Sequence, residues 1–320
     1  MKIFVAGATG VLGRASLHAL IEAGHQVRAT GRGKEKSELV RSLGAEPLEI
    51  DLFDESAVRQ AVSGMDAVLR LTTKIPSLTK MRSSRNWDET NRLRTEGARI
   101  MVDAAIARNV PVYVHESITF VYQDGGTKWL TEDAPVDDGD SHILRATLEG
   151  EQHALRFSNA GGRGIVLRFG GFYGADAPST SEMANMARHH LLFFFGSGSN
   201  YFSSIHVPDA GRAVAAALSV PAGIYNVCDD SPVPFAENLR TFTASMGLPS
   251  PIRLPAFLSK WMFGDVFKYL SRSLRVSNAR LKQVSTWTPQ VRSVSDGWPL
   301  IAGQMKQHSA NDRILRASGT

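Results

Sequence analysis

Residues 5–14 read VAGATGVLGR. This stretch places Gly7, Gly10 and Gly13 directly after a short apolar run and at the start of a segment with apolar residues at helical spacing. The first glycine permits a tight turn, the second lets backbone approach a pyrophosphate, and the third lets a helix pack closely on a strand. A helix N-terminus also offers unpaired N–H groups to phosphate oxygens. The context predicts a dinucleotide-binding turn rather than an ordinary glycine-rich loop.

Short apolar runs alternate with helical patterns along the first half of the chain. The runs cover residues 2–7, 26–32, 46–52, 66–72, 111–117 and 164–171, and the helical patterns cover residues 9–25, 35–45, 55–65, 89–109 and 146–162. Regular alternation of this kind predicts an α/β fold with a doubly wound parallel sheet of the Rossmann type.

The alternation stops after Gly171, which predicts a second, smaller region. We assign residues 1–170 to the Rossmann domain, to which residues 203–228 return, and residues 171–202 and 229–302 to a substrate-binding region. Apolar residues at helical spacing in 254–272 predict a helical lid over a ligand. Residues 303–320 lack an apolar stripe and are expected to form a loose tail.

Composition limits the classes of partner. The 320 residues include 36 Lys and Arg against 31 Asp and Glu, spread without a basic block, which does not favour nucleic acid. A single cysteine excludes an intramolecular disulfide and favours the cytoplasm. No apolar run approaches the ~20 residues that span a bilayer, and residues 1–10 do not read as a signal peptide. We expect a cytoplasmic protein with a small-molecule ligand and no metal, nucleic-acid or membrane partner, either monomeric or homodimeric.

The end of the second predicted strand distinguishes two nicotinamide carriers. An NAD site usually places Asp or Glu there, against the ribose 2′-OH. Residues 27–36 read VRATGRGKEK, with no acid before Glu35. Arg28 and Arg32 lie close by, and a guanidinium can hold a 2′-phosphate through two hydrogen bonds. We predict NADP(H) with Arg32 as the main contact, the alternative being a solvated basic turn.

The chain resembles the extended short-chain dehydrogenase/reductases of the NAD-dependent epimerase/dehydratase type over roughly residues 1–300. The resemblance rests on GATGVLG (7–13), DLFD (51–54), GMDAVLRLTT (64–73), NRLRTEG (91–97), VHESITFVY (114–122), LRFGGFYG (167–174), SIHVPDAGRA (204–213) and GIYNVCDD (223–230). It implies cofactor contacts at the adenine, the ribose, the nicotinamide and its carboxamide, each with packing alone as the alternative. Together with the turn and the arginines, the expected cofactor residues are Gly7, Thr9, Gly10, Val11, Leu12, Gly13, Arg28, Arg32, Asp51, Leu52, Leu71, Thr72, Thr73, Asn91, Phe172 and Tyr173.

The chemistry of that family uses a Tyr, a Lys four residues later, and a Ser or Thr. In this chain the Tyr place falls on Ile143, the Lys place on Thr147 and the Ser/Thr place on Ile118. None of the six tyrosines is followed by lysine four residues later. The sequence therefore predicts a cofactor site that lacks the standard proton donor.

Three outcomes follow from the missing donor. Another side chain can serve, directly or through water, and the candidates are Ser117, Thr119, Tyr122 and His142, with Ser117 first. A phenol next to the reacting carbonyl of the substrate can supply the proton, so that the protein only aligns the reactants. Alternatively, there is no redox chemistry at all.

The substrate side is apolar. Phe202 stands where nucleotide-sugar members of the family carry an arginine, which disfavours a diphosphate ligand. Flat apolar ligands suit aromatic pockets, and the expected contacts are Phe194, Phe202, Phe257, Trp261 and Met262, the alternative being core or a dimer surface. The combination resembles atypical short-chain reductases of aromatic polyketides, of the angucyclinone type, in antibiotic biosynthesis. It implies an NADP(H)-dependent ketoreductase for a bulky phenolic natural product, with an epimerase or isomerase and a non-catalytic NADP-sensing protein as alternatives.

Overall fold

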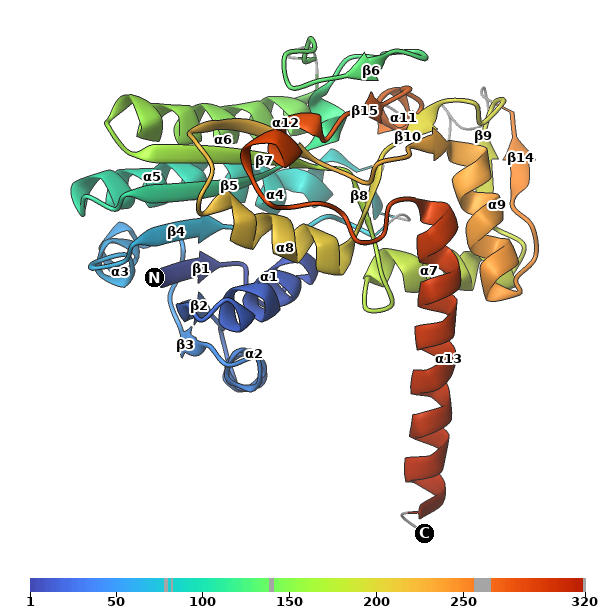
Figure 1. Cartoon of the computed structure of the whole chain (residues 1–320), viewed down its shortest axis with the longest axis horizontal. Coiled ribbons are helices and arrows are strands. Elements are labelled where there is room, and N and C mark those ends of the chain that lie inside the picture. The colour runs from blue at the N-terminus through green and yellow to red at the C-terminus, as the bar shows by residue number, and fades with distance from the viewer. Residues whose placement is uncertain (78–79, 82, 138–140, 256–265, 319–320) are drawn as a thin grey trace.

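The computed structural model describes residues 1–77, 80–81, 83–137, 141–255 and 266–318. A seven-stranded parallel sheet of order β12-β7-β5-β4-β1-β2-β3 forms its centre (Figure 1). The strands are β1 (Lys2–Ala6), β2 (Gln26–Thr30), β3 (Glu46–Leu48), β4 (Ala67–Arg70), β5 (Val112–Ile118), β7 (Arg163–Phe169) and β12 (Gly223–Val227). The predicted doubly wound α/β fold is confirmed.

Helices cover both faces of the sheet. One face packs against α1 (Val11–Glu22) and α8 (Val207–Ala217), and the other against α3 (Glu55–Ala61), α5 (Ala98–Ala107) and α6 (His142–Asn159). The remaining helices of this part are α2 (Lys34–Ser42), η2 (Ser84–Trp87), α4 (Asp88–Arg92), the π-helical turn η3 (Leu93–Gly97) and η4 (Thr119–Val121). Each face buries its own apolar cluster, as a sheet covered on both sides requires.

The order of the strands reverses between β1 and β4. Chain order runs outward from β1 through β2 and β3 in one direction, and through β4, β5, β7 and β12 in the other. Ala6, the last residue of β1, lies opposite Arg70, the last residue of β4. Ligands of open α/β sheets bind at such a switch point, beyond the carboxyl ends of the strands, so the crevice lies here.

The smaller region lies beside the carboxyl end of the sheet (Figure 1). It contains paired short strands: β6 (Trp129–Leu130) with β15 (Arg275–Val276), β8 (Gly171–Tyr173) with β11 (Ser204–His206), β9 (Phe193–Phe195) with β14 (Ile252–Leu254), and β10 (Tyr201–Phe202) with β13 (Val233–Pro234). Its helices are α7 (Pro178–Arg188), α9 (Phe235–Met246), α11 (Val266–Leu270) and α13 (Val294–Ser318), whereas α12 (Ala279–Val284) packs on the edge strand β12 of the central sheet. Phe242 and Trp298 pack edge to face in its core, with ring centroids 4.8 Å apart.

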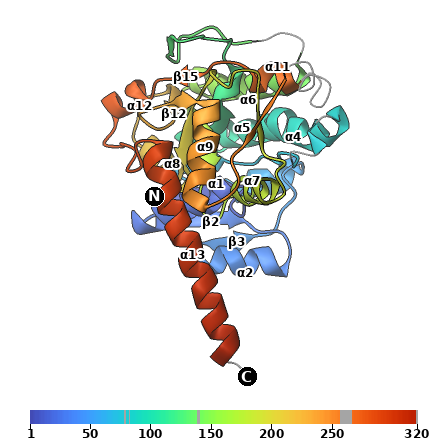
Figure 2. The same ribbon diagram turned by 90° about the vertical axis from the view of Figure 1, so that its right-hand side faces the viewer.

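Helix α13 differs from the expected loose tail, because it continues without a break to Ser318. Its C-terminal half extends away from the body of the molecule (Figure 2). Residues 304–318 contain no glycine or proline, so no residue ends the helix there. No helix in the described part of the chain is both long and apolar enough to cross a membrane.

Candidate active site

The glycine turn holds three backbone segments in close contact. Gly7 has φ +93°, and a Cβ added there would lie 2.5 Å from the carbonyl oxygen of Leu71. A Cβ on Gly13 would lie 2.1 Å from the carbonyl oxygen of Gly7. Gly10 is exposed, and its N–H donates to the carbonyl of Gly7 at 3.2 Å. The turn thus packs tightly between β4 and α1 and presents bare backbone at Gly10.

The N-terminus of α1 is open for an anion. Gly10 is the N-cap, no side chain caps the helix, and its first turn carries no acidic residue. Arg14 donates to the carbonyl of Thr9 at 3.1 Å, which steadies the turn from behind. Thr9 and Val11 are half-buried, while Leu12 is buried in the sheet core. Free N–H groups and the helix dipole therefore face the crevice, and this arrangement fits the pyrophosphate of a dinucleotide.

The two predicted arginines differ in their surroundings. Arg28 forms an ion pair with Glu46 on β3, with Nε 3.3 Å from the carboxylate. Arg32 lies exposed in the loop between β2 and α2. Next to it, the N–H of Gly33 donates to the carboxylate of Glu49 at 3.1 Å. Arg32 is thus the exposed arginine after β2, whereas Arg28 is half-buried beside its acidic partner.

The other expected cofactor residues lie along the ends of the strands. Asp51 is exposed after β3 and accepts from the N–H of Phe53 at 3.0 Å, with Leu52 half-buried beside it. Leu71 continues β4, and its N–H donates to the carbonyl of Ala6 at 2.9 Å.

Beyond Leu71, Thr72 is buried, Thr73 is half-buried, and Asn91 is half-buried on α4. At β8, Phe172 packs on Phe169 with ring centroids 5.4 Å apart. Tyr173 is buried instead, and its hydroxyl donates to the carbonyl of Ser293 at 3.3 Å.

Helix α6 carries an isoleucine and a tied threonine where the family has its tyrosine and lysine. Ile143 and Thr147 are 7% and 1% exposed. The hydroxyl of Thr147 donates to the carbonyl of Ile143 at 2.8 Å and accepts from Arg94 Nη1 at 2.9 Å. Neither residue offers a free acidic proton to the crevice.

Ser117 and Tyr122 belong to one buried polar network. Ser117 Oγ donates to Glu151 at 2.5 Å, and Arg168 donates from Nε and Nη2 to the same carboxylate at 2.8 and 2.6 Å. The Arg168 guanidinium lies 4.9 Å from the centre of the Tyr122 ring, whose hydroxyl donates to Asn226 at 2.8 Å. Burial raises the pKa of Tyr122 to about 12, which makes it a weak proton donor at neutral pH.

Of the remaining two candidates, Thr119 adjoins this network, because its carbonyl accepts from the N–H of Tyr122 at 3.1 Å. Thr119 is buried at the start of η4. His142 is exposed at the first residue of α6. The structure therefore brings Ser117 and Tyr122 together through Glu151 and Arg168, and leaves His142 at the surface.

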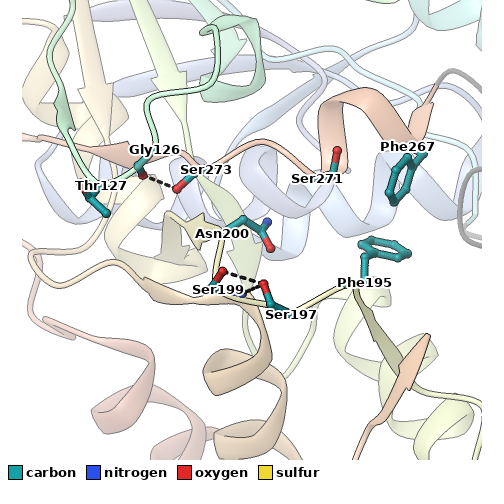
Figure 3. Close-up of a pocket in the computed structure, with 10 residues that line it drawn as sticks. Gly126, Thr127, Phe195, Ser197, Ser199, Asn200, Phe267, Ser271 and Ser273 are labelled. Atoms are coloured by element: carbon teal, nitrogen blue, oxygen red, sulfur yellow. Dashed lines mark hydrogen bonds between the residues drawn. The ribbon is translucent and has the colours of Figure 1, made fainter. Parts of the chain in front are cut away.

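A cavity of about 380 Å³ opens in the smaller region (Figure 3). The rings of Phe195 and Phe267 meet edge to face at its wall, with centroids 5.3 Å apart. Hydroxyl and amide groups supply the polar part, and none of the lining residues is charged. The lining is Gly126, Thr127, Phe195, Gly196, Ser197, Ser199, Asn200, Phe267, Ser271 and Ser273. Such a lining suits a neutral ligand with aromatic surface.

A row of five phenylalanines extends from this cavity to η4, the turn that follows β5. Ring centroids are 5.8 Å apart for Phe120 and Phe202, 5.5 Å for Phe202 and Phe235, and 5.9 Å for Phe235 and Phe195, with Phe267 next. A Cβ on Gly171, next to the expected carboxamide contact, would lie 2.6 Å from the Phe202 ring. Phe120, on η4 directly after β5, ends the row on this side, and Phe202 is the next ring.

The expected substrate residues fall in three places. Phe202 lies in the aromatic row, while Phe194 is buried in the core of the smaller region, under Arg240. Phe257, Trp261 and Met262 lie outside the described residues. Phe195 and Phe267 belong to the apolar segments expected on the substrate side, whereas Phe120 and Phe235 of the aromatic row were not expected. Their only signal is apolar character, which core residues share.

The fold and the turn define a dinucleotide-binding protein of the Rossmann class. The chain belongs to the NAD dependent epimerase/dehydratase family, whose model matches residues 3–228. This membership, together with the glycine turn, supports a nicotinamide dinucleotide cofactor. It agrees with the extended short-chain dehydrogenase/reductase type expected from the motifs.

Three relatives show where the chain stands in this family. It is 33% identical over 312 residues to a 3-diazoavenalumate denitrifying reductase of a Streptomyces species, covering 93% of this chain and 99% of the relative. It is 26% identical over 257 residues to the 4-hydroxy-2-methyl-3-oxo-4-farnesyl-3,4-dihydroquinoline-1-oxide ketoreductase of Stigmatella aurantiaca, covering 79% and 75%. The crystal structure of human epimerase family protein SDR39U1 with NADPH superposes with a TM-score of 0.77 at 21% identity, covering 95% and 99%. Relatives named as reductases support an oxidoreductase.

Proposed function

We propose that this protein is an NADPH-dependent reductase for a bulky, mostly apolar aromatic substrate, and that it works without a tyrosine–lysine proton relay. One observation carries the proposal: the glycine turn presents bare backbone at an uncapped helix N-terminus, while Ile143 and the tied Thr147 occupy the places of the relay. When bound, the cofactor supplies hydride.

The residues of this chain bind and orient the reactants. The turn at Gly7, Gly10 and Gly13 holds the pyrophosphate, and Arg32 holds the 2′-phosphate from the loop after β2. The aromatic row holds the substrate ring, with Phe120 and Phe202 at the end of the row next to β5 and β8. Holding two reactants in register can contribute about 7–11 kcal/mol to lowering the barrier, a contribution that remains when a general acid worth about 3–5 kcal/mol is absent.

A phenolic ketone is the first acceptor class. A ketone that gains hydride carries a negative charge on its oxygen, which must receive a proton. A phenol next to the carbonyl can donate that proton within the substrate, and water then restores the phenol. Ser117 hydrogen-bonds Glu151 inside the protein, so the substrate phenol or water is the better proton source.

A diazo group is the second acceptor class, and the relative named as a denitrifying reductase favours it. An arenediazonium cation that gains hydride becomes a neutral diazene, which loses N₂ and leaves a C–H bond on the ring. The charges balance, and no oxygen needs a proton. The absent tyrosine and lysine are thus explained without any substitute acid.

The test uses the purified protein with NADPH and two parallel substrate sets, phenolic aromatic ketones and arenediazonium salts. Loss of NADPH absorbance, corrected for the rate without protein, is followed together with formation of alcohol or of N₂. Deuterated NADPH locates the transferred hydride in the product. Failure to bind NADPH would refute the proposal. Binding of NADPH without turnover of either substrate set would favour the non-catalytic sensing protein. A rearranged product without net loss of NADPH would favour the isomerase.

The choice of NADPH over NADH is tested separately at Arg32. Arg32→Ala should weaken the binding of NADPH by about 10- to 100-fold, because a charge-assisted hydrogen bond to phosphate is lost. The same change should weaken the binding of NADH by less than about twofold. Arg41, exposed on α2, provides the matched control. Equal losses for both carriers would rule out the role in binding the 2′-phosphate.

A further inference from the structure

Two buried arginines lie beside the switch point of the sheet. Arg70 ends β4, opposite the last residue of β1, and is 0% exposed. Arg94 lies in the π-helical turn η3 and is 1% exposed. In both side chains, Nε and Nη2 have no hydrogen-bond partner among the described residues. Buried guanidinium groups are normally paired, so these two require an explanation.

Among the described residues, Glu116 is the one carboxylate that interacts with both arginines. Arg70 Nη1 lies 3.5 Å from the carbonyl oxygen and from a carboxylate oxygen of Glu116. Arg94 Nη1 donates to the neutral Thr147 hydroxyl at 2.9 Å. Burial, then Arg70 and Arg94, lower the pKa of the adjoining His115 well below its ordinary value, so this ring stays neutral. The two guanidinium groups therefore share the single negative charge of Glu116, and one positive charge of the pair is left over.

The neighbouring network of Ser117, Glu151 and Arg168 does not neutralise this excess positive charge. Glu151 accepts both hydrogen bonds of Arg168, so that pair is neutral by itself. Burial lowers the pKa of Arg94, yet a guanidinium keeps its proton at neutral pH. One net positive charge thus remains under the carboxyl ends of β4 and β5. An unpaired buried charge destabilises a fold, so its presence points to function.

The backbone around Arg94 has an unusual conformation and packs closely against its neighbours. Helix α4 passes through the π-helical turn η3 before α5 begins, and π-turns inside helices are frequent at functional sites. Helix α6 approaches closely at Gly150, where an added Cβ would lie 2.7 Å both from the Arg94 carbonyl oxygen and from His115 Nε2. Thr147 on the same helix then reaches Arg94 Nη1.

We propose that Arg94 is a positioning residue that places a permanent positive charge beneath the cofactor crevice and so discriminates between the two redox states of the nicotinamide. The inference rests on the proposed function. The reduced ring is neutral and the oxidised ring is a cation, so a buried charge that solvent does not screen disfavours the oxidised form. The protein takes up reduced cofactor and releases oxidised cofactor more readily.

The first test measures the dissociation constants of NADPH and NADP⁺ for wild type, Arg94→Met and the charge-conserving Arg94→Lys. Arg94→Met should tighten NADP⁺ relative to NADPH by about fivefold, the change expected for one unit charge across a layer of side chains. Arg94→Lys should keep the wild-type ratio. A folded Arg94→Met with the wild-type ratio would overturn the proposal, whereas a wild type that binds neither form would instead refute the proposed function.

The second test moves the positive charge from position 94 to position 147 and measures the melting temperature of each variant in the absence of cofactor. Arg94→Met should melt no lower than wild type, because it removes the uncompensated charge; unfolding of this variant would show Arg94 to be structural. Thr147→Lys alone adds a second unpaired cation and should lower the melting temperature by about 5 °C or more. The double variant Arg94→Met/Thr147→Lys should regain both the stability and the wild-type affinity ratio, and failure on either count contradicts the charge role.

Discussion

Alanine at Gly10 and at Gly13 should separate cofactor binding from folding. Gly10 has φ −72° and ψ 173°, which alanine adopts readily, and the nearest contact of an added Cβ is the Gly7 carbonyl oxygen at 3.4 Å. At Gly13 the added Cβ would lie 2.1 Å from that oxygen and 2.6 Å from the Ala8 carbonyl carbon. The first methyl fits the protein and the second does not.

The expected magnitudes follow from these contacts. Gly10→Ala should lower the free energy of unfolding by only about 0.5 kcal/mol, the cost of alanine at an N-cap. It should weaken NADPH about tenfold or more, because the methyl group covers N–H donors that are each worth about 1.5–3 kcal/mol to a charged ligand. Gly13→Ala should cost about 1–3 kcal/mol from overpacking, partly offset by about 1 kcal/mol of helix propensity. Gly13→Ala should also displace the turn and weaken NADPH.

Urea unfolding and NADPH titration measure the two quantities. Gly303→Ala on α13 is the matched control, because nothing lies within 4 Å of its added Cβ. It should leave NADPH affinity unchanged. If Gly10→Ala binds NADPH with wild-type affinity, the phosphate contact is refuted. If Gly13→Ala is as stable as wild type, α1 does not pack tightly against the turn.

Three further changes test the site and its support. Glu151→Ala should cost about 3–5 kcal/mol in urea unfolding because it leaves Arg168 buried and unpaired, and a loss no larger than that of Glu151→Gln would contradict this. Phe202→Ala should raise the substrate KM while leaving the NADPH dissociation constant unchanged; a parallel loss of NADPH would place the ring at the cofactor instead. Burial would raise the pKa of Asp209, but hydrogen bonds from a histidine and two backbone N–H groups hold it below its ordinary value. Its stabilisation is therefore present above the unfolded pKa of about 4 and is lost as pH falls, so the deficit of Asp209→Asn at neutral pH should shrink in acid.

The central sheet could be predicted because its signals are local. Each buried parallel strand is a short apolar run, and each crossover helix shows its own period, so the order of elements is legible along the chain. The helical end of the chain was missed for the converse reason. Residues 304–318 carry no apolar stripe, and α13 continues past Gly303 because nothing stops it.

The sequence by itself determined the dinucleotide turn and the absence of a tyrosine–lysine pair, since both depend only on residue type and spacing. Tertiary structure decided which side chains meet. Adjacent residues of a strand face opposite sides, so register alone sends Phe194 into the core and Phe195 to the cavity. The contact between Arg94 and Thr147 joins two helices 53 residues apart, and no local pattern encodes a partner at that distance.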